Sequence, residues 1–328
     1  MKNLLILFSI SILFSCGGNK TAQQTDNKPV VQISIPTFNA DSAYNFVKAQ
    51  VDFGARVPQT EPHKKCAEYL AATLQKFGAE VENQHGKGTL YNGKSIDIHN
   101  IIGKFNPSAN GRILLCAHWD SRPYADHDKD ESKRNTAILG ANDGASGVGV
   151  LLEIARNLKT LPENIGIDIV FFDVEDWGAP QFYRENRHND SWCIGSKFWA
   201  QEAKKANYRA SFGILLDMVG APSARFYKER FSMRYAANIV EKVWNKAQML
   251  GFDGYFINKL GGEIMDDHVN VNTIAQIPCI NIIHQEPNSP NGTGFFEHWH
   301  TTQDDMRNID KNTLFAVGTV VMNIIFSE

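Results

Sequence analysis

Four short runs of apolar residues, separated by stretches with helical periodicity, constrain the fold more than any other feature of this sequence. The runs occupy residues 113–117, 167–172, 212–216 and 279–283. Short, nearly continuous apolar runs are typical of strands buried on both faces. The clearest helical patterns lie between or after them, at residues 147–158, 195–204 and 231–250. Strands that alternate with helices indicate a mainly parallel sheet covered on both faces.

The region before residue 113 predicts two helices and a hairpin. Residues 42–51 and 62–77 have helical spacing, and Gly78 directly follows the second stretch. Strand patterns follow at residues 81–84, 89–91 and 96–102, with a hairpin signal at Asn92 and Gly93. No internal repeat, long linker or block of charge divides residues 36–328. We therefore expect one domain, a single-domain α/β/α sandwich around a central mixed, mostly parallel sheet.

Composition excludes several classes of protein. The chain has 328 residues, of which 43% are apolar and 21% charged, as in ordinary globular proteins. Its 33 Lys and Arg residues do not outnumber its 36 Asp and Glu residues. Without a basic excess to neutralise phosphates, we expect no nucleic-acid partner. Four widely spaced cysteines follow residue 16, with no CxxC pair, so we expect mostly buried free thiols rather than a thiolate zinc site.

The N-terminal residues predict a targeting segment. Lys2 precedes an apolar run at residues 4–14, which is shorter than the about 20 residues that a membrane-spanning helix needs. Cys16 follows, and the segment resembles the signal of a bacterial lipoprotein, whose cysteine is lipidated. We expect a signal peptide at residues 1–15, a flexible tether at 16–35 and the functional domain at 36–328. The protein would then be exported to the periplasm and contact a membrane only through Cys16; an ordinary cleaved signal is the alternative.

Carboxylates and imidazoles follow each apolar run. In chain order they are His118 and Asp120, Glu175 and Asp176, Asp217, and His284. Because ligands bind at the carboxyl ends of the strands in open α/β sheets, we expect these side chains to meet at one edge. The adjacent anions Glu175 and Asp176 repel each other unless a cation or a shared proton compensates. Asp and His ligands around a divalent ion, with one position open, are typical of catalytic zinc sites.

These motifs resemble those of two related enzyme families. His118 and Asp120, Asp143 before Gly-Ala-Ser-Gly, the acidic pair at 175–176, Asp217 and His300 occur in the order of the metal set of M28-type zinc aminopeptidases. A narrower resemblance, to the glutaminyl cyclases of the animal type, rests on residues 195–197, 215–221, 266–268 and 296–305. Typical aminopeptidases carry Ser-Asp-His where this chain has Asp-Asp-His. The resemblance covers roughly residues 40–328.

The resemblance also implies a site and a reaction. It implies that one zinc ion is bound by Asp143, Asp176 and His300. It implies that the catalytic residues are the general acid/base Glu175 and a hydrogen-bonded pair formed by Asp217 and Asp266. The pocket would be lined by Trp299, Phe295, Ile264 and His268, together with Trp177 or Trp192, a choice that stays open. The enzyme would cyclise the N-terminal glutamine of peptides and proteins to pyroglutamate and release ammonia.

Two departures and two alternatives accompany this interpretation. Asp176 stands where the animal enzymes have Glu, and residues 148–150 offer no disulfide partner for Cys116. The alternative enzyme is a two-zinc aminopeptidase, in which Asp143 bridges two ions, His118 and Asp217 bind the second, and Glu175 activates water. The alternative of another class is a binding protein that kept the fold but lost catalysis. Metal content and the product, ammonia or a free amino acid, distinguish all three.

Overall fold

A mixed sheet forms the centre of the described residues, 35–185, 191–289 and 292–328 of the computed structural model, and its six strands there lie in the order β1-β2-β4-β3-β5-β8. Their bounds are β1 (Glu80–Thr89), β2 (Ser95–Phe105), β3 (Gly111–His118), β4 (Ile165–Phe172), β5 (Phe212–Asp217) and β8 (Cys279–Ile283). Strands β4, β3, β5 and β8 are parallel, whereas β2 runs antiparallel to both of its neighbours. The expected mixed, mostly parallel sheet is confirmed.

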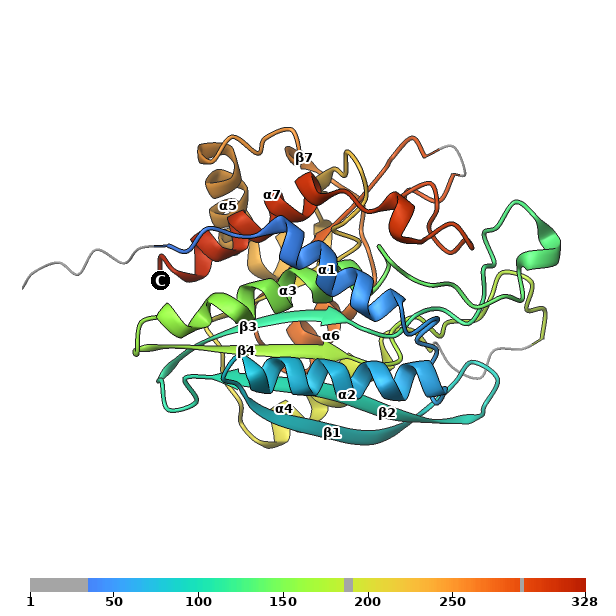
Figure 1. Ribbon diagram of the computed structural model, residues 1–328, viewed down its shortest axis with the longest axis horizontal. Coiled ribbons are helices and arrows are strands. Elements are labelled where there is room, and N and C mark those ends of the chain that lie inside the picture. The colour runs from blue at the N-terminus through green and yellow to red at the C-terminus, as the bar shows by residue number, and fades with distance from the viewer. Residues whose placement is uncertain (1–34, 186–190, 290–291) are drawn as a thin grey trace, which may run out of the picture. The chain divides into compact units, whose positions relative to one another are not determined.

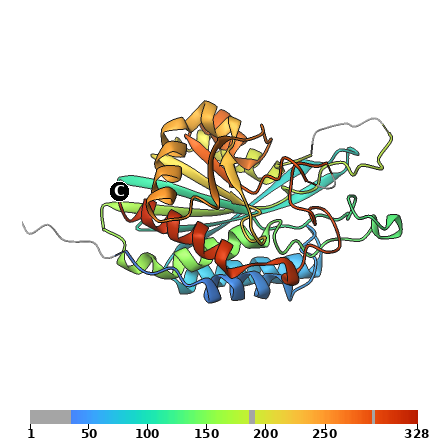
Figure 2. The same ribbon diagram turned by 90° about the horizontal axis from the view of Figure 1, so that it is seen from above.

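Helices cover both faces of this sheet (Figure 1, Figure 2). One face carries α1 (Ala40–Val51), α2 (Glu61–Lys76), α3 (Ala145–Asn157) and α7 (Lys311–Ile325), and the other carries α4 (Ile194–Lys205) and α6 (Asp267–Thr273). Helix α5 (Arg230–Met249) packs along the edge strand β8 and against α7. A parallel pair, β6 (Phe226–Lys228) and β7 (Phe256–Leu260), forms a second, small sheet. Short 3-10 helices are η1 (Glu131–Lys133), η2 (Leu158–Thr160) and η3 (Met306–Asn308).

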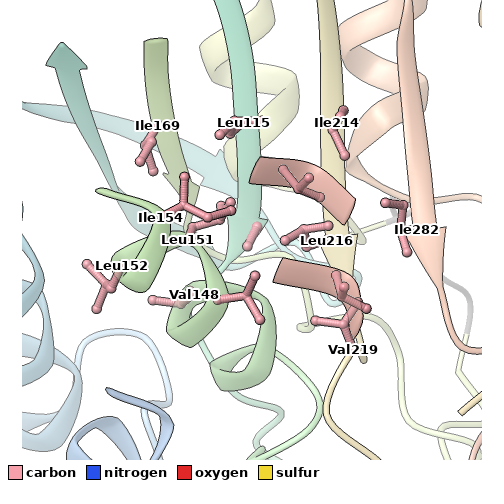
Figure 3. Packing of buried hydrophobic residues seen from close by; sticks show 14 of the residues in the cluster. Leu115, Val148, Leu151, Leu152, Ile154, Ile169, Ile214, Leu216, Val219 and Ile282 are labelled. Carbon is pink, nitrogen blue, oxygen red and sulfur yellow. The ribbon is translucent and has the colours of Figure 1, made fainter. Parts of the chain in front are cut away.

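Alternate residues of the central strands enter two separate cores. On β3, Leu115 belongs to the core that also contains α3, whereas Leu114 and Cys116 belong to the core that contains α4 and α6. In Figure 3 the apolar side chains of α3, among them Leu151, lie next to those of the strands, among them Leu216. Each fully buried side chain of this size contributes about 1.5–3 kcal/mol. Burial on both faces explains why these strands have continuous apolar sequences.

The N-terminal hairpin is more regular than expected. The piece predicted at 81–84 and the first residue of the piece predicted at 89–91 belong to one strand, β1, which pairs with β2 over its whole length, whereas residues 90–91 lie beyond its end. The turn between β1 and β2 contains Gly93 in the left-handed region, with φ 79°. The four cysteines after residue 16 are free and buried, as expected. The expected signal peptide and Cys16 lie outside the described residues, and within those residues no helix has the length and apolarity to cross a membrane.

The parallel strands all end at one edge of the sheet, where the chemically active residues gather. His118 is the last residue of β3 and Asp217 the last of β5, while Glu175 follows shortly after β4. In Figure 1 the arrowheads of β3 and β4 point to the same side of the molecule. The loops beyond these ends form the candidate site.

Candidate metal and catalytic site

A pocket of about 340 Å³ opens at this edge of the sheet, a volume that suits a small ligand. Its polar lining consists of Asp143, Glu175, Asp176, Asp217, Asp266 and His300. Its apolar lining consists of Trp192, Met218, Ile264, Met265, Ile283, Phe295 and Trp299. The structure therefore brings together every residue that we expected to bind metal or to take part in catalysis.

Asp143, Asp176 and His300 bring three donor atoms within 4.8 Å of one another. Nε2 of His300 lies 3.3 Å from Oδ1 of Asp176 and 3.5 Å from Oδ2 of Asp143. A tetrahedral zinc ion with bonds of about 2.0–2.1 Å holds its ligand atoms about 3.3 Å apart. All three side chains are buried, and within the described residues Oδ2 of Asp176 has no hydrogen-bond partner. The donor set therefore fits a zinc ion.

A second candidate set shares Asp143. Nε2 of His118 lies 3.0 Å from Oδ1 of Asp143 and 3.3 Å from Oδ1 of Asp217, and all three residues are buried. Burial disfavours a charged imidazole, but hydrogen bonding to Asp120, Asp143 and Asp217 outweighs it and holds the pKa of His118 well above its ordinary value. This group of anions thus attracts a cation, either a proton on His118 or a second metal ion.

A strained turn after β4 presents the acidic pair to the pocket. Val174 has φ 51°, a conformation that is costly for a β-branched residue. The buried carboxylate of Asp120 accepts hydrogen bonds from the backbone N–H groups of Glu175 at 3.1 Å and of Asp176 at 3.2 Å. One carboxylate therefore holds both backbone positions, and both acidic side chains line the same pocket.

Aromatic rings surround the metal-binding histidine. The rings of Trp299 and His300 stack with centroids 3.6 Å apart, and the ring of Trp192 lies parallel to that of His300 at 6.0 Å. Phe295 packs against Trp299 at 4.8 Å. Trp192, and not Trp177, therefore forms the wall that the sequence left open. The side chain of Trp177 packs instead on a separate apolar cluster with Val174 and Ile194.

Sequence similarity to known proteins assigns the chain to a family. Residues 100–325 match the sequence model of peptidase family M28. The chain belongs to this family. A glutaminyl-peptide cyclotransferase of Drosophila melanogaster is 30% identical over 294 residues, which cover 81% of this chain and 75% of that protein.

Two proteins of solved structure have a higher sequence identity to this chain. The glutaminyl cyclase of Tannerella forsythia is 53% identical, with a TM-score of 0.86, and the match covers 89% of this chain and 100% of that one. A zinc-dependent exopeptidase of Parabacteroides distasonis is 52% identical, with a TM-score of 0.87, and the match covers 90% of this chain and 100% of that one. Both confirm the fold, and the second is named as a zinc-dependent enzyme.

Asp143 of the M28 chain is fixed by two features of its loop. Gly144 follows it with φ 97°, and a Cβ atom there would lie 2.6 Å from the backbone oxygen of Asp120, so only glycine fits. The carboxylate of Asp304 accepts hydrogen bonds from the backbone N–H groups of Asn142 and Asp143, at 2.8 Å and 3.0 Å. Burial, together with the charge of Asp143, raises the pKa of Asp304 to about 7. Sequence reasoning missed this role, although Asp304 lies within the motif at 296–305.

Glu175 has the properties of a proton carrier. Burial raises its pKa well above the ordinary value, and the negative charges of Asp176, Asp267 and Asp266 add to this, against an opposing effect of His118. The thiol of Cys193 donates a hydrogen bond to its Oε1 at 3.2 Å. A carboxyl group with a raised pKa can accept and return a proton near neutral pH.

The expected hydrogen-bonded pair of Asp217 and Asp266 stays a prediction, and the structure places both residues on one pocket. Both carboxylates line the pocket, but each has another neighbour. Asp217 lies beside His118, whereas Asp266 accepts hydrogen bonds from Nδ2 of Asn281 and from the backbone N–H of Asp267, both at 2.5 Å. Burial, with repulsion from Asp266 and Asp143, raises the pKa of Asp217 to about 7. A neutral Asp217 is therefore accessible near physiological pH.

His268 does not line the pocket, contrary to expectation. Its side chain is fully buried, and its Nε2 lies 3.0 Å from Oε2 of Glu229. Glu229 in turn accepts hydrogen bonds from the backbone N–H groups of Phe231, Ser232 and Ile264. This network lies behind the pocket and anchors Ile264, which does line it. His268 therefore supports the wall rather than forming it.

Proposed function

We propose that this M28 chain cyclises the N-terminal glutamine of peptides and proteins to pyroglutamate, with release of ammonia, and that it uses one zinc ion. The observation that carries the proposal is the set of aromatic rings around Asp143, Asp176 and His300. Such walls suit a small folded side chain and exclude the water that a hydrolase admits. The similarity to the cyclases of Tannerella forsythia and Drosophila melanogaster supports the same reaction.

The residues of the pocket have distinct roles in the proposed reaction. A zinc ion held by Asp143, Asp176 and His300 supplies Lewis-acid polarisation of the γ-carbonyl group of the glutamine. Glu175 takes a proton from the attacking α-amine and returns it to the departing nitrogen. Its raised pKa, and the 3.2 Å hydrogen bond from Cys193, suit a group that alternates between the two protonation states.

The walls and the two further carboxylates orient the substrate. Trp299, Trp192 and Phe295 hold the glutamine so that its own amine, and not water, lies next to the amide carbon. Asp217 and Asp266 face the same cavity and accept hydrogen bonds from the amine and the leaving group. Intramolecular attack then replaces hydrolysis.

Ammonia release from Gln-initiated peptides, measured with a coupled assay, tests the proposal. We expect release that depends on zinc, while leucine amide stays intact. Metal analysis should find one tightly bound zinc ion per chain, lost on the Asp143→Asn substitution. Release of free amino acids faster than ammonia would contradict the proposal.

A two-zinc aminopeptidase is the second candidate, favoured by one observation. His118, Asp143 and Asp217 lie close enough to hold a second ion, and one similar structure is a zinc-dependent exopeptidase. Two tightly bound zinc ions per chain, with one lost on the His118→Ala substitution, would support this candidate. Hydrolysis of leucine amide by the purified protein would also support this candidate.

The proposal includes export and a lipid anchor. The apolar run at residues 4–14 and Cys16 support a lipoprotein signal and a periplasmic location. Detergent partitioning of the wild type and of Cys16→Ser tests this. The wild type should enter the detergent phase and the variant the aqueous phase; two soluble proteins would contradict the anchor.

A further inference from the structure

Arg122 lies buried beside the proposed metal ligand Asp176. The residue is 1% exposed. Its Nη1 donates to Oδ1 of Asp176 at 3.1 Å and to the backbone oxygen of the same residue at 3.3 Å. Its guanidinium carbon lies 4.7 Å from the centre of the Trp192 ring. One side chain therefore contacts a metal ligand and a wall of the pocket.

The rest of the guanidinium holds Asp126, which faces a second metal ligand. Nε and Nη2 of Arg122 donate to the two oxygens of Asp126, each at 2.8 Å. Oδ1 of Asp126 lies 3.5 Å from Nδ1 of His300, and within the described residues that nitrogen has no hydrogen-bond partner. A histidine that binds metal through one ring nitrogen usually donates the other N–H to a carboxylate or carbonyl. A contraction of about half an ångström would make Asp126 that acceptor.

The segment that contains Asp126 also forms hydrogen bonds with the backbone around His300. This residue has φ 55°, in the left-handed region, which is unfavourable without support. The backbone N–H of His127 donates to the oxygen of His300 at 3.1 Å. Oδ2 of Asp128 accepts from the N–H and the hydroxyl group of Thr302, at 3.0 Å and 2.6 Å. Residues 126–128 therefore fix the segment that carries His300 at several points.

We propose that Arg122 and Asp126 are a positioning pair, which sets the metal ligands Asp176 and His300 in their relative orientation. Both oxygens of Asp126 accept hydrogen bonds from Arg122, and Oδ1 also faces Nδ1 of His300, so Asp126 acts through His300. A buried ion pair is by itself weak evidence for a stabilising role. We therefore infer the role of this pair from its contacts with two metal ligands. The inference rests on the proposed metal site but not on the identity of the substrate.

Asp126→Asn tests this inference, because the amide keeps the volume of the side chain. The measurement is the zinc dissociation constant of the full chain, from competition with a chelator, with circular dichroism to follow the fold. We expect zinc binding to weaken by about 10–100-fold, the effect of losing an outer-shell partner of a metal ligand. Arg122→Lys keeps the charge but cannot contact both carboxylates in the same way, and we expect it to weaken zinc binding as well.

The matched control is Asp168→Asn. Asp168 forms a second buried pair, in which Arg112 donates to its two oxygens at 2.6 Å and 2.5 Å, and it does not line the pocket. Zinc affinity within twofold of wild type is expected for this variant. The inference is overturned if Asp126→Asn binds zinc as tightly as wild type, if the control loses as much affinity, or if the wild type binds no zinc. Zinc binding without ammonia release would contradict the proposed reaction alone.

Discussion

Replacing Asp120 with Asn tests whether one carboxylate holds the acidic pair in place. The two oxygens of this fully buried residue accept hydrogen bonds from the backbone N–H groups of Glu175 and Asp176, at 3.1 Å and 3.2 Å. In Asn, an NH2 group replaces one oxygen and so points a donor at a donor. The variant loses one charge-assisted hydrogen bond, about 1.5–3 kcal/mol, and leaves one buried N–H without an acceptor, about 1–3 kcal/mol. Because both effects concern the same N–H, we expect the free energy of unfolding to fall by about 2–4 kcal/mol.

Urea unfolding and steady-state kinetics together measure the consequence. A displaced Glu175 should also lower kcat by about tenfold or more, since small misplacements of catalytic groups are costly. Asp253→Asn, at an exposed position, is the control and should change the unfolding free energy by less than about 0.5 kcal/mol. If Asp120→Asn unfolds like this control and keeps its kcat, the reasoning about the turn after β4 is wrong.

Three further predictions concern single groups. Glu175→Gln should keep its zinc by elemental analysis but lower kcat by about 10²–10⁴-fold, because the amide cannot take up and return a proton. Burial of Glu229 is outweighed by hydrogen bonds from His268 and backbone N–H groups, which hold its pKa at about 2, below the ordinary 4.5. Its contribution to stability is therefore complete above about pH 4.5 and is lost as the pH falls towards 2; Glu229→Gln should flatten this part of the urea-unfolding profile. Burial raises the pKa of Cys66 to about 12, so iodoacetamide should alkylate it only after unfolding, as mass spectrometry of the peptides would report.

The sheet was predictable where burial is complete and less so elsewhere. The central strands are buried on both faces, so their apolar runs located them to within two residues at either end. The edge strand β1 is exposed or half-buried throughout and contains Gly86 and Gly88, so its sequence carries no continuous apolar signal. Helix α7 is apolar on nearly all sides because other elements surround it, and it lacks the one-sided pattern that identifies a surface helix. Helix α6 is only seven residues long and was also missed.

The site was predictable to the extent that it depends on the ends of parallel strands. That rule brought the carboxylates and His118 to one edge, and the structure places them there. The residues that hold them in place were not predicted, because their contacts link distant parts of the chain: Asp304 contacts Asp143 across 161 positions, and Arg122 contacts Asp176 across 54. His268 belongs to a motif that suggested a pocket wall, but its ring lies in the interior beside Glu229.

Mass spectrometry of a Gln-initiated peptide incubated with the zinc-loaded protein tests the proposed reaction most directly. Intramolecular attack on the side-chain amide removes one ammonia molecule and breaks no peptide bond. The peptide should therefore lose the mass of ammonia and keep every residue, and the Glu175→Gln variant should leave it unchanged. Loss of the N-terminal residue, with a free amino acid in solution, would contradict cyclisation and identify the chain as an aminopeptidase.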